Sequence, residues 1–201
     1  MARDFPVQPW WAAYVIHPDD EQKFGAEPFY SYYRTKYELA KRCAPRDICE
    51  IGVRWGYSAW AFLAAAPEAS YSGFDRQAGT HGGVKGVNTF GYVETLLQRD
   101  FSGVCVCLHE ADTRQCRTLA GFYDFIHIDG DHSEDGCRHD LELALKACHA
   151  GGSILVDDYD YIAGVRRAVD GFVACHADRF SSQLHVPGLR GEYLITTKGG
   201  A

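Results

Sequence analysis

The chain has 201 residues, a length that fits one folded domain. Its 20 lysines and arginines stand against 27 aspartates and glutamates, so the formal net charge is -7 and no basic cluster stands out. This balance argues against nucleic acid or anionic lipid as a partner, because both attract positive surfaces. No apolar run reaches membrane-spanning length, and residues 1–20 lack the apolar core of a signal peptide. We therefore expect a cytoplasmic protein.

The eight cysteines are spread through the expected strands and helices and form no CxxC pair. Cys105 and Cys107 alternate within one expected strand, so a zinc site there would need ligands from elsewhere in the chain. This distribution predicts reduced, mostly buried thiols and no disulfide framework.

Apolar periodicity and turn residues predict a regular alternation of helices and strands along the chain. In chain order, the expected elements are a helix at 29–43, a strand at 47–52, a helix at 58–66, a strand at 71–75, a helix at 93–99, a strand at 104–110, a weaker helix at 113–122, a strand at 123–129, a helix at 135–150, a strand at 153–158, a helix at 162–176, and strands at 179–186 and 192–197.

This order predicts an α/β fold of the Rossmann-like, doubly wound type. Its seven-stranded sheet would be mostly parallel and would end in an antiparallel C-terminal hairpin. Ligands of such sheets bind outside the carboxyl ends of the strands, so the residues that close each strand are the candidate site. The glycine-rich stretch 78–86 lies in one of these loops, and a functional lid and a plain linker are equally open there.

The first strand runs into a turn that contains two glycines and opens a helix. Glycine allows a sharp turn and a close approach of the backbone to a ligand, and the helix N-terminus offers free N–H groups. The dinucleotide fingerprint GxGxxG is not met, because Arg54 stands at a glycine position. The candidate residues of this turn are Glu50, Gly52, Gly56 and Ser58.

Carboxylates also close the next two strands, at Asp75 and at Glu110-Ala111-Asp112. Asp75 lies where this fold presents an acid to the ribose hydroxyls of an adenosine-containing ligand, and both NAD and S-adenosylmethionine would use it. Asp112 follows the third strand and could accept a hydrogen bond from an adenine amino group. Both positions predict an adenosyl ligand without deciding which one.

Doubled acids close the fourth and fifth strands: Asp129 and Asp131 precede His132, and Asp157 and Asp158 are adjacent. Neighbouring parallel strands bring these carboxylates to one place, where like charges repel and need compensation. Oxygen ligands favour a hard divalent cation, so the pattern predicts a Mg²⁺ site.

Three segments resemble the small class I S-adenosylmethionine-dependent methyltransferases, a group that includes catechol O-methyltransferase and, more closely, the macrocin and novobiocin sugar O-methyltransferases. They are EIGVRWGYS (50–58), YSGFD (71–75) and, most distinctively, FIHIDGDHSEDGCRHDLELALKACHAGGSILVDDY (125–159). The resemblance covers residues 48–172. It implies a methyltransferase domain at residues 46–201. The aromatic and helical segment at residues 1–45 precedes the first strand and so can fold across the strand ends, on the substrate side.

The resemblance also assigns roles to residues. Glu50, Gly52, Gly56, Ser58, Asp75 and Asp112 would bind S-adenosylmethionine, and Asp129, Asp157 and Asp158 would bind the divalent metal. The general base lies just after the first metal ligand. Resemblance favours Asp131, whereas the intrinsic pKa of an imidazole favours His132. At Glu134 and Asp135 the chain departs from the group, which commonly has an aromatic residue there, so the acceptor stays open.

The expected function is therefore methyl transfer from S-adenosylmethionine to a hydroxyl of a small molecule, such as a sugar or a phenol, with Mg²⁺ assistance. Two alternatives remain: another metal-assisted reaction on the same fold, and a non-catalytic adenosyl-binding module. A homo-oligomer is compatible with either. Aromatic residues near the N-terminus could form a substrate wall but more commonly pack in a core or dimer: Trp10, Trp11, Tyr30, Tyr32 and Tyr33. His127 alternates into a strand interior and reads as a core histidine.

Overall fold

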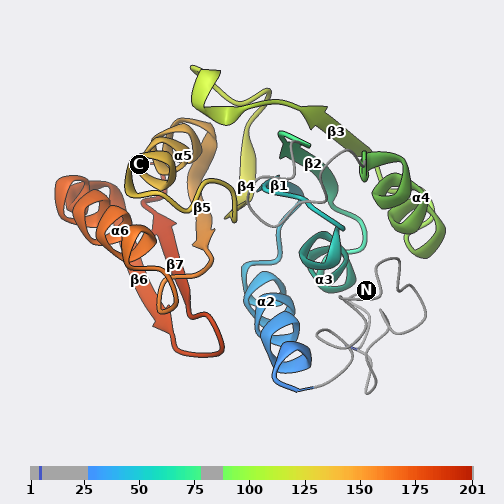
Figure 1. The fold of residues 1–201 in the computed structure, drawn as a ribbon, viewed down its shortest axis with the longest axis horizontal. Coiled ribbons are helices and arrows are strands. Elements are labelled where there is room, and N and C mark those ends of the chain that lie inside the picture. The colour runs from blue at the N-terminus through green and yellow to red at the C-terminus, as the bar shows by residue number, and fades with distance from the viewer. Residues whose placement is uncertain (1–4, 6–26, 78–87, 201) are drawn as a thin grey trace.

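A computed structural model of the chain describes residue 5 and residues 27–77 and 88–200. Its centre is a seven-stranded sheet in the order β3-β2-β1-β4-β5-β7-β6 (Figure 1). The first five strands are parallel, and β7 is antiparallel to both β5 and β6. The predicted sheet and its C-terminal hairpin are thereby confirmed. The strands are β1 (Asp47–Ile51), β2 (Ser70–Asp75), β3 (Val106–Glu110), β4 (Tyr123–Ile128), β5 (Cys148–Val156), β6 (Phe180–Val186) and β7 (Glu192–Thr197).

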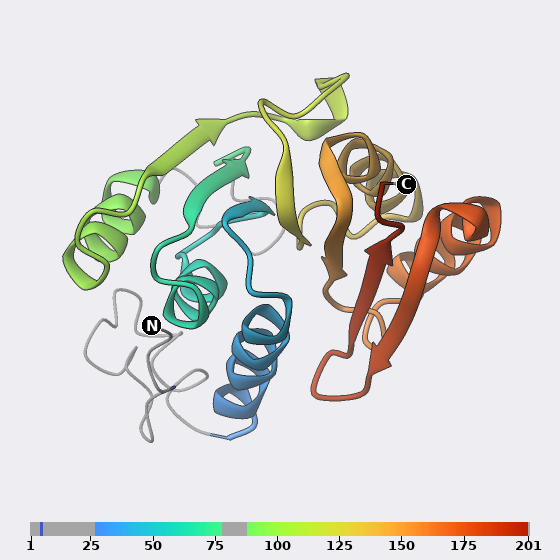
Figure 2. The same ribbon diagram turned by 180° about the vertical axis from the view of Figure 1, so that it is seen from behind.

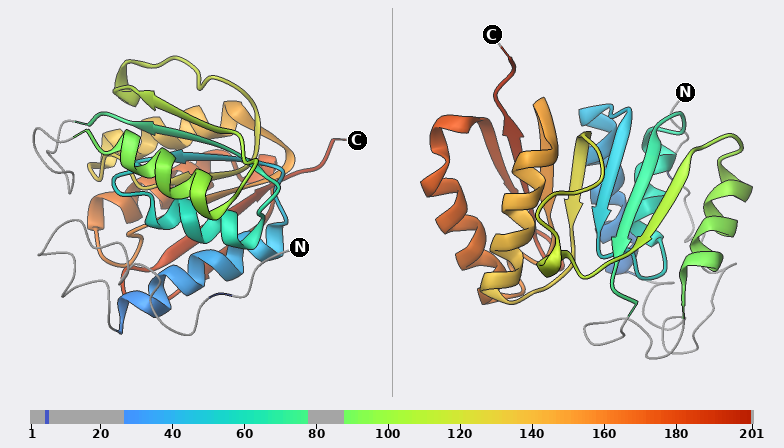
Figure 3. Two further views of the ribbon diagram at one scale, coloured as in Figure 1. Left: turned by 90° about the vertical axis from the view of Figure 1, so that its right-hand side faces the viewer. Right: turned by 90° about the horizontal axis from the view of Figure 1, so that it is seen from above.

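Helices cover both faces of this sheet (Figures 2 and 3). α2, α3 and α4 pack on one face and α5 and α6 on the other. Successive strand residues point to opposite faces, so Ile48 packs with the first group of helices and Cys49 with the second. The helices are α2 (Phe29–Cys43), α3 (Tyr57–Ala65), α4 (Phe90–Asp100), α5 (Glu134–Ala147) and α6 (Ala163–Cys175), with short 3-10 turns η2 (Thr113–Gln115) and η3 (Ala177–Arg179). No helix in the described ranges combines the length and the apolarity that a membrane crossing requires.

Two predicted helices are wrong in extent. The helix expected at 113–122 is only the 3-10 turn η2, since Thr113 and Leu119 alone are buried in this stretch and a helix would have no apolar face. The helix expected to run to Ala150 ends at Ala147, because Cys148 already pairs with Tyr123 in the sheet.

The cysteine prediction holds for pairing but not for burial. All eight cysteines are free, yet Cys105, Cys107 and Cys175 are exposed. Cys107 lies on β3, the edge strand, whose apolar residues Val106 and Leu108 face the core while the opposite side of the strand is open to solvent. The prediction of mostly buried thiols was therefore wrong, because an edge strand is covered on one side only.

Asp140 of α5 is a fully buried carboxylate in this core. Burial raises its pKa to about 6, although Thr113 and His139 act in the opposite direction. Because the folded pKa lies above the usual 3.8, this group favours folding only while it is protonated. Its contribution is present below about pH 4 and is lost as the pH rises through about 6.

We predict that Asp140→Asn gains stability relative to the wild type as the pH rises from 4 to above 6. The difference between pKa values of about 6 and 3.8 corresponds to at most about 3 kcal/mol. Urea unfolding at a series of pH values measures this gain. Parallel stability curves for the two proteins would contradict the assignment.

Candidate functional site at the carboxyl ends of the strands

The turn after β1 lies where the sheet order reverses, between β1 and β4. Gly52 has φ +91° and Gly56 has φ +74°, and Arg54 between them also has a positive φ. A Cβ atom on Gly52 would lie 2.0 Å from the carbonyl oxygen of Asp129, at the end of β4. Glycine is thus required here both by the backbone conformation and by the contact between two strand ends.

Asp75, at the end of β2, holds this turn in place. Its Oδ2 accepts hydrogen bonds from the backbone N–H groups of Val53 and Arg54, both at 2.9 Å, and its Oδ1 accepts one from Gln77 at 2.7 Å. The structure therefore brings together Asp75 and the glycine turn, as the sequence predicts for an adenosyl-binding edge.

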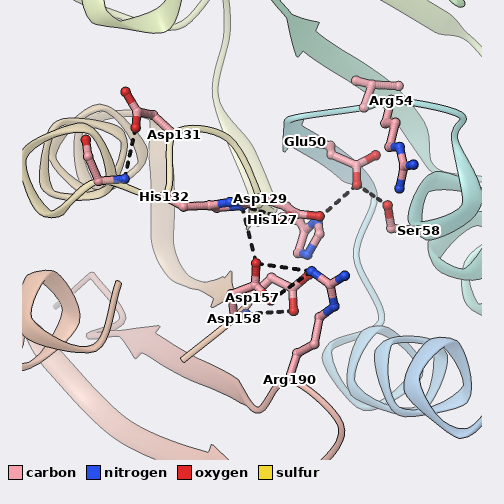
Figure 4. Close-up of polar contacts among 12 residues, drawn as sticks. Glu50, Arg54, Ser58, His127, Asp129, Asp131, His132, Asp157, Asp158 and Arg190 are labelled. Atoms are coloured by element: carbon pink, nitrogen blue, oxygen red, sulfur yellow. Dashed lines mark hydrogen bonds and ion pairs between the residues drawn. The ribbon is translucent and has the colours of Figure 1, made fainter. Parts of the chain in front are cut away.

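Glu50 lies behind the turn, with its side chain fully buried. Its carboxylate accepts hydrogen bonds from Ser58 and Tyr71, and it contacts His127 Nδ1 at 2.9 Å (Figure 4). His127 is itself fully buried, which confirms it as a core histidine. Glu50 is therefore enclosed by its partners, one of which is Ser58 in the first turn of α3.

Asp112 follows β3 and caps η2. Its carboxylate accepts hydrogen bonds from Arg114 Nε and Nη2, both at 3.1 Å, and lies 3.6 Å from Arg76 Nη1. The hydrogen bonds from Arg114 hold the pKa of Asp112 below its usual value. Ala111 N–H bonds to the carbonyl of Asp75 at 3.0 Å, so Asp112 lies at the same edge as Asp75.

Asp129, His132 and Asp158 form the tightest acidic cluster of the described residues, with ligand atoms all within 4.8 Å of one another. His132 Nε2 lies 3.1 Å from Asp129 Oδ1 and 3.3 Å from Asp158 Oδ2 (Figure 4). The hydrogen bond to Asp129 raises the pKa of His132 to about 9. Burial raises the pKa of Asp158 to about 6, and the nearby carboxylates add to this. We refer to these three residues as the acid cluster.

Asp157 and Asp131 point elsewhere. The carboxylate of Asp157 accepts a hydrogen bond from Tyr32 and lies 3.2 Å from Lys36 Nζ, both on α2. Asp131 turns toward the start of α5, where it accepts a hydrogen bond from Ser133 N–H at 2.9 Å (Figure 4). Of the two candidate bases, His132 is therefore the one whose side chain contacts Asp129 and Asp158.

The chain supplies cations of its own to this edge. Arg190, from the turn between β6 and β7, places Nη1 3.1 Å from Asp158 Oδ1 and 3.4 Å from Oδ2. Lys36 compensates Asp157 in the same way. Sequence reasoning expected an external cation to balance these carboxylates and missed both internal ones.

The sequence carries a signal for one of the two missed residues, Lys36, and none for the other, Arg190. Lys36 falls on the buried stripe of α2 with Tyr32 and Ala40, four residues to either side, and a lysine on such a stripe is an unusual feature that the sequence displays. Arg190 lies in a hairpin turn, and nothing in the local pattern indicates that it reaches Asp158.

Of the aromatic residues near the N-terminus, Tyr32 and Tyr33 are buried in a cluster with Trp55 and Tyr57, and Tyr32 also contacts Asp157. Tyr30 packs partly buried against this cluster. Trp10, Trp11 and the glycine-rich stretch 78–86 lie outside the described residues.

Comparison with known proteins agrees with this geometry. Residues 49–159, more than half of the chain, match the model of a family described as a methyltransferase domain, and the chain belongs to this family. The class I methyltransferase fold predicted from the sequence is thus confirmed. A comparison with curated protein sequences found no significant match.

Solved structures show the same fold at low identity. A Podospora anserina methyltransferase, PaMTH1, bound to S-adenosylhomocysteine, is 21% identical with a TM-score of 0.66, covering 97% of this chain and 88% of that one. The O-methyltransferase TomG of Streptomyces achromogenes, in complex with S-adenosylmethionine, is 16% identical with a TM-score of 0.62, covering 96% of each chain. An O-methyltransferase of Bacillus cereus, in complex with S-adenosylhomocysteine, is 17% identical with a TM-score of 0.62, covering 96% and 97%.

The contact at Gly52 yields a stability prediction. Gly52→Ala should lose at least about 1 kcal/mol of folding free energy, because the positive φ and the overlap with Asp129 act together. Chemical denaturation measures the loss. Gly171→Ala is the matched control, since Gly171 lies in α6 with open space where its Cβ would be. Equal stabilities of the two variants would mean that β1 and β4 can separate without cost.

Proposed function

We propose that the protein transfers the methyl group of S-adenosylmethionine to a hydroxyl group of a small molecule. The observation that carries this proposal is the contact between Gly52 and Asp129, which sets a candidate adenosyl-binding turn directly beside a cluster of two carboxylates and an imidazole. A methyl donor and a group that activates an acceptor must lie this close for in-line transfer.

The cofactor would lie along the edge formed by the glycine turn, Asp75 and Asp112. Oδ2 of Asp75 uses both of its acceptor sites on Val53 and Arg54, but Oδ1 accepts only from Gln77 and keeps one site for a ribose hydroxyl. Neighbours of the same fold carry S-adenosylmethionine or S-adenosylhomocysteine in their structures, which supports this choice of ligand over NAD.

The donor set of the acid cluster fits a hard divalent cation such as Mg²⁺. Asp129 and Asp158 would hold it, because Mg²⁺ prefers one or two carboxylates together with water and substrate oxygens. When bound, such an ion lowers the pKa of an acceptor hydroxyl. His132 and Asp129 are 26% and 29% exposed whereas Asp158 is buried, so ligands from solvent would reach the cluster from the side of His132 and Asp129.

His132 is the proposed general base. Its contacts with Asp129 and Asp158 hold its pKa at about 9, so without a cation it would accept a proton only above about pH 9. A divalent cation on these two carboxylates would offset their effect and free Nε2 to accept a proton near neutral pH. In the reaction the acceptor oxygen forms a bond to the methyl carbon, the sulfur–carbon electron pair returns to sulfur, and the hydroxyl proton passes to His132 Nε2. The products are the methyl ether and S-adenosylhomocysteine. Asp131 is less suited because its carboxylate faces Ser133 and Arg114.

A metal-independent version of the same transfer is favoured by a specific observation, the pairing of Arg190 with Asp158. If Arg190 is the resident counterion, the acid cluster needs no external charge. The acceptor in both versions would be a small hydroxylated molecule, a sugar or a phenol. The ring of Tyr161, 69% exposed and 5.4 Å from the Arg190 guanidinium, offers it an aromatic surface.

The cofactor assignment predicts that S-adenosylmethionine binds with a Kd on the order of 1 µM, or about -8 kcal/mol. Asp75→Ala should weaken this binding at least about tenfold, because it removes both the ribose acceptor and the support of the turn. Isothermal titration calorimetry decides. Binding of NAD without binding of S-adenosylmethionine would refute methyl transfer.

The metal assignment predicts that EDTA abolishes turnover and that Mg²⁺ restores it. Turnover is measured as S-adenosylhomocysteine formed with a panel of phenols and sugars. Asp129→Asn should lower Mg²⁺ affinity and turnover together, while His132→Ala should keep the ion and lose turnover. Loss of Mg²⁺ binding in His132→Ala would make it a ligand, and full turnover in EDTA would leave Arg190 as the counterion.

A further inference from the structure

Lys36 is a fully buried lysine whose ammonium group has three polar neighbours. Its Nζ lies 2.6 Å from Glu192 Oε1, 3.2 Å from Asp157 Oδ2 and 3.1 Å from His127 Nε2. An ammonium group has three N–H donors and no acceptor, so each donor has a partner here. This arrangement joins α2 to three different strands, β4, β7 and the end of β5.

The contact with His127 extends the network to the cofactor edge. Because the ammonium group can only donate, His127 Nε2 must accept, and His127 Nδ1 carries the proton that it donates to Glu50 Oε1 at 2.9 Å. Glu50 in turn accepts from the hydroxyl of Ser58, in the first turn of α3. A continuous path of hydrogen bonds therefore runs from Lys36 to Ser58.

The contact with Asp157 extends the network to the acid cluster. Tyr32 donates to the same carboxylate, so α2 holds Asp157 with two residues. The other oxygen of Asp157 accepts the backbone N–H of Asp158 at 2.8 Å. That bond fixes Asp158 at φ +61°, a conformation that few residues other than glycine adopt, with its carboxylate toward His132.

We propose that Lys36 is a positioning residue for both halves of the site, fixing Asp157 directly and Glu50 through His127. Asp157 thereby orients Asp158 of the acid cluster and is not itself a member of that cluster. The inference rests on the proposed function, because that function assigns the two halves to a cation and to the adenosyl cofactor. Replacing a residue that orients a ligating group commonly lowers ligand affinity by about 10- to 100-fold.

Three variants separate the two arms of the network. Tyr32→Phe removes one contact of Asp157 and should lower Mn²⁺ affinity about tenfold while S-adenosylhomocysteine affinity changes less than about twofold. His127→Phe, whose ring would pack beside Phe62, removes the contact with Glu50 and should show the reverse pattern. Lys36→Met should weaken both ligands. Calorimetry with Mn²⁺ and with S-adenosylhomocysteine measures the affinities.

Tyr123→Phe is the matched control. It also removes a tyrosine hydroxyl from the core, one that donates to the carbonyl of Ala120 at 2.6 Å, but it lies at the opposite end of β4. It should lower the unfolding temperature and leave both affinities unchanged. A merely structural role of the network would make Tyr32→Phe and His127→Phe behave like this control, and that result would overturn the inference.

The remaining outcomes are also decisive. If the wild type binds S-adenosylhomocysteine but no Mn²⁺, the metal proposal fails and the Asp157 arm of this inference fails with it. If the wild type binds both ligands and folded Lys36→Met binds them equally well, the inference alone is overturned. If Lys36→Met does not fold, opposite selectivity of Tyr32→Phe and His127→Phe supports the inference, and equal effects on both ligands overturn it.

Discussion

The backbone contact between Gly52 and Asp129 is the constraint on which the rest of the site depends. It allows the ends of β1 and β4 to meet without an intervening side chain. The turn that leaves β1 can then be held by Asp75 from β2, while the loop that leaves β4 carries His132 toward Asp158 on the next strand. A bulkier residue at position 52 would push these two halves apart, so one glycine sets the distance between them.

Charge balance is the second constraint, and the chain meets much of it internally. Burial alone would lower the pKa of Lys36, but the carboxylates of Asp157 and Glu192 outweigh burial and hold that pKa above its usual value. Burial raises the pKa of Glu192, and the nearby Asp157 carboxylate adds to this effect. Arg190 offsets Asp158 from the other side. Of the three strand-end aspartates, Asp129 alone has only the imidazole of His132 as a cationic neighbour at salt-bridge distance within the described residues.

The sheet and most helices were predictable because their signals are local. Alternation of strands and helices, glycine at turns and apolar stripes reflect short-range conformation and burial, and the prediction of α2 agrees with the structure at both ends. The helix predicted at 113–122 was wrong because a helix needs a buried apolar face as well as residues that favour helical conformation. The candidate cofactor edge was predictable for a related reason, since parallel strands deliver their last residues to a common edge.

The side chains that pair with the strand-end aspartates could not be predicted in the same way. Adjacent Asp157 and Asp158 look equivalent in sequence, but successive backbone positions send their side chains in different directions, one toward α2 and the other toward His132. The direction of each side chain depends on residues far away in the chain. Asp157 pairs with Lys36, about 120 residues earlier, and Asp158 pairs with Arg190 in the turn between β6 and β7. Such long-range pairs become visible only when the elements are packed.

The position of α2 links these observations to the segment that the sequence predicts on the substrate side. Sequence reasoning assigned residues 1–45 to the substrate side because they precede the first strand, and α2 is the described part of that segment. The ring centre of its Tyr32 lies 4.5 Å from the Lys36 ammonium and 6.0 Å from the Arg190 guanidinium of the hairpin. The hydroxyl of Tyr32 also donates a hydrogen bond to Asp157. α2 therefore contacts Asp157 directly and lies near Arg190, and these are two of the residues that contact Asp158, one through its backbone N–H and the other through its carboxylate. These contacts tie α2 to the acid cluster.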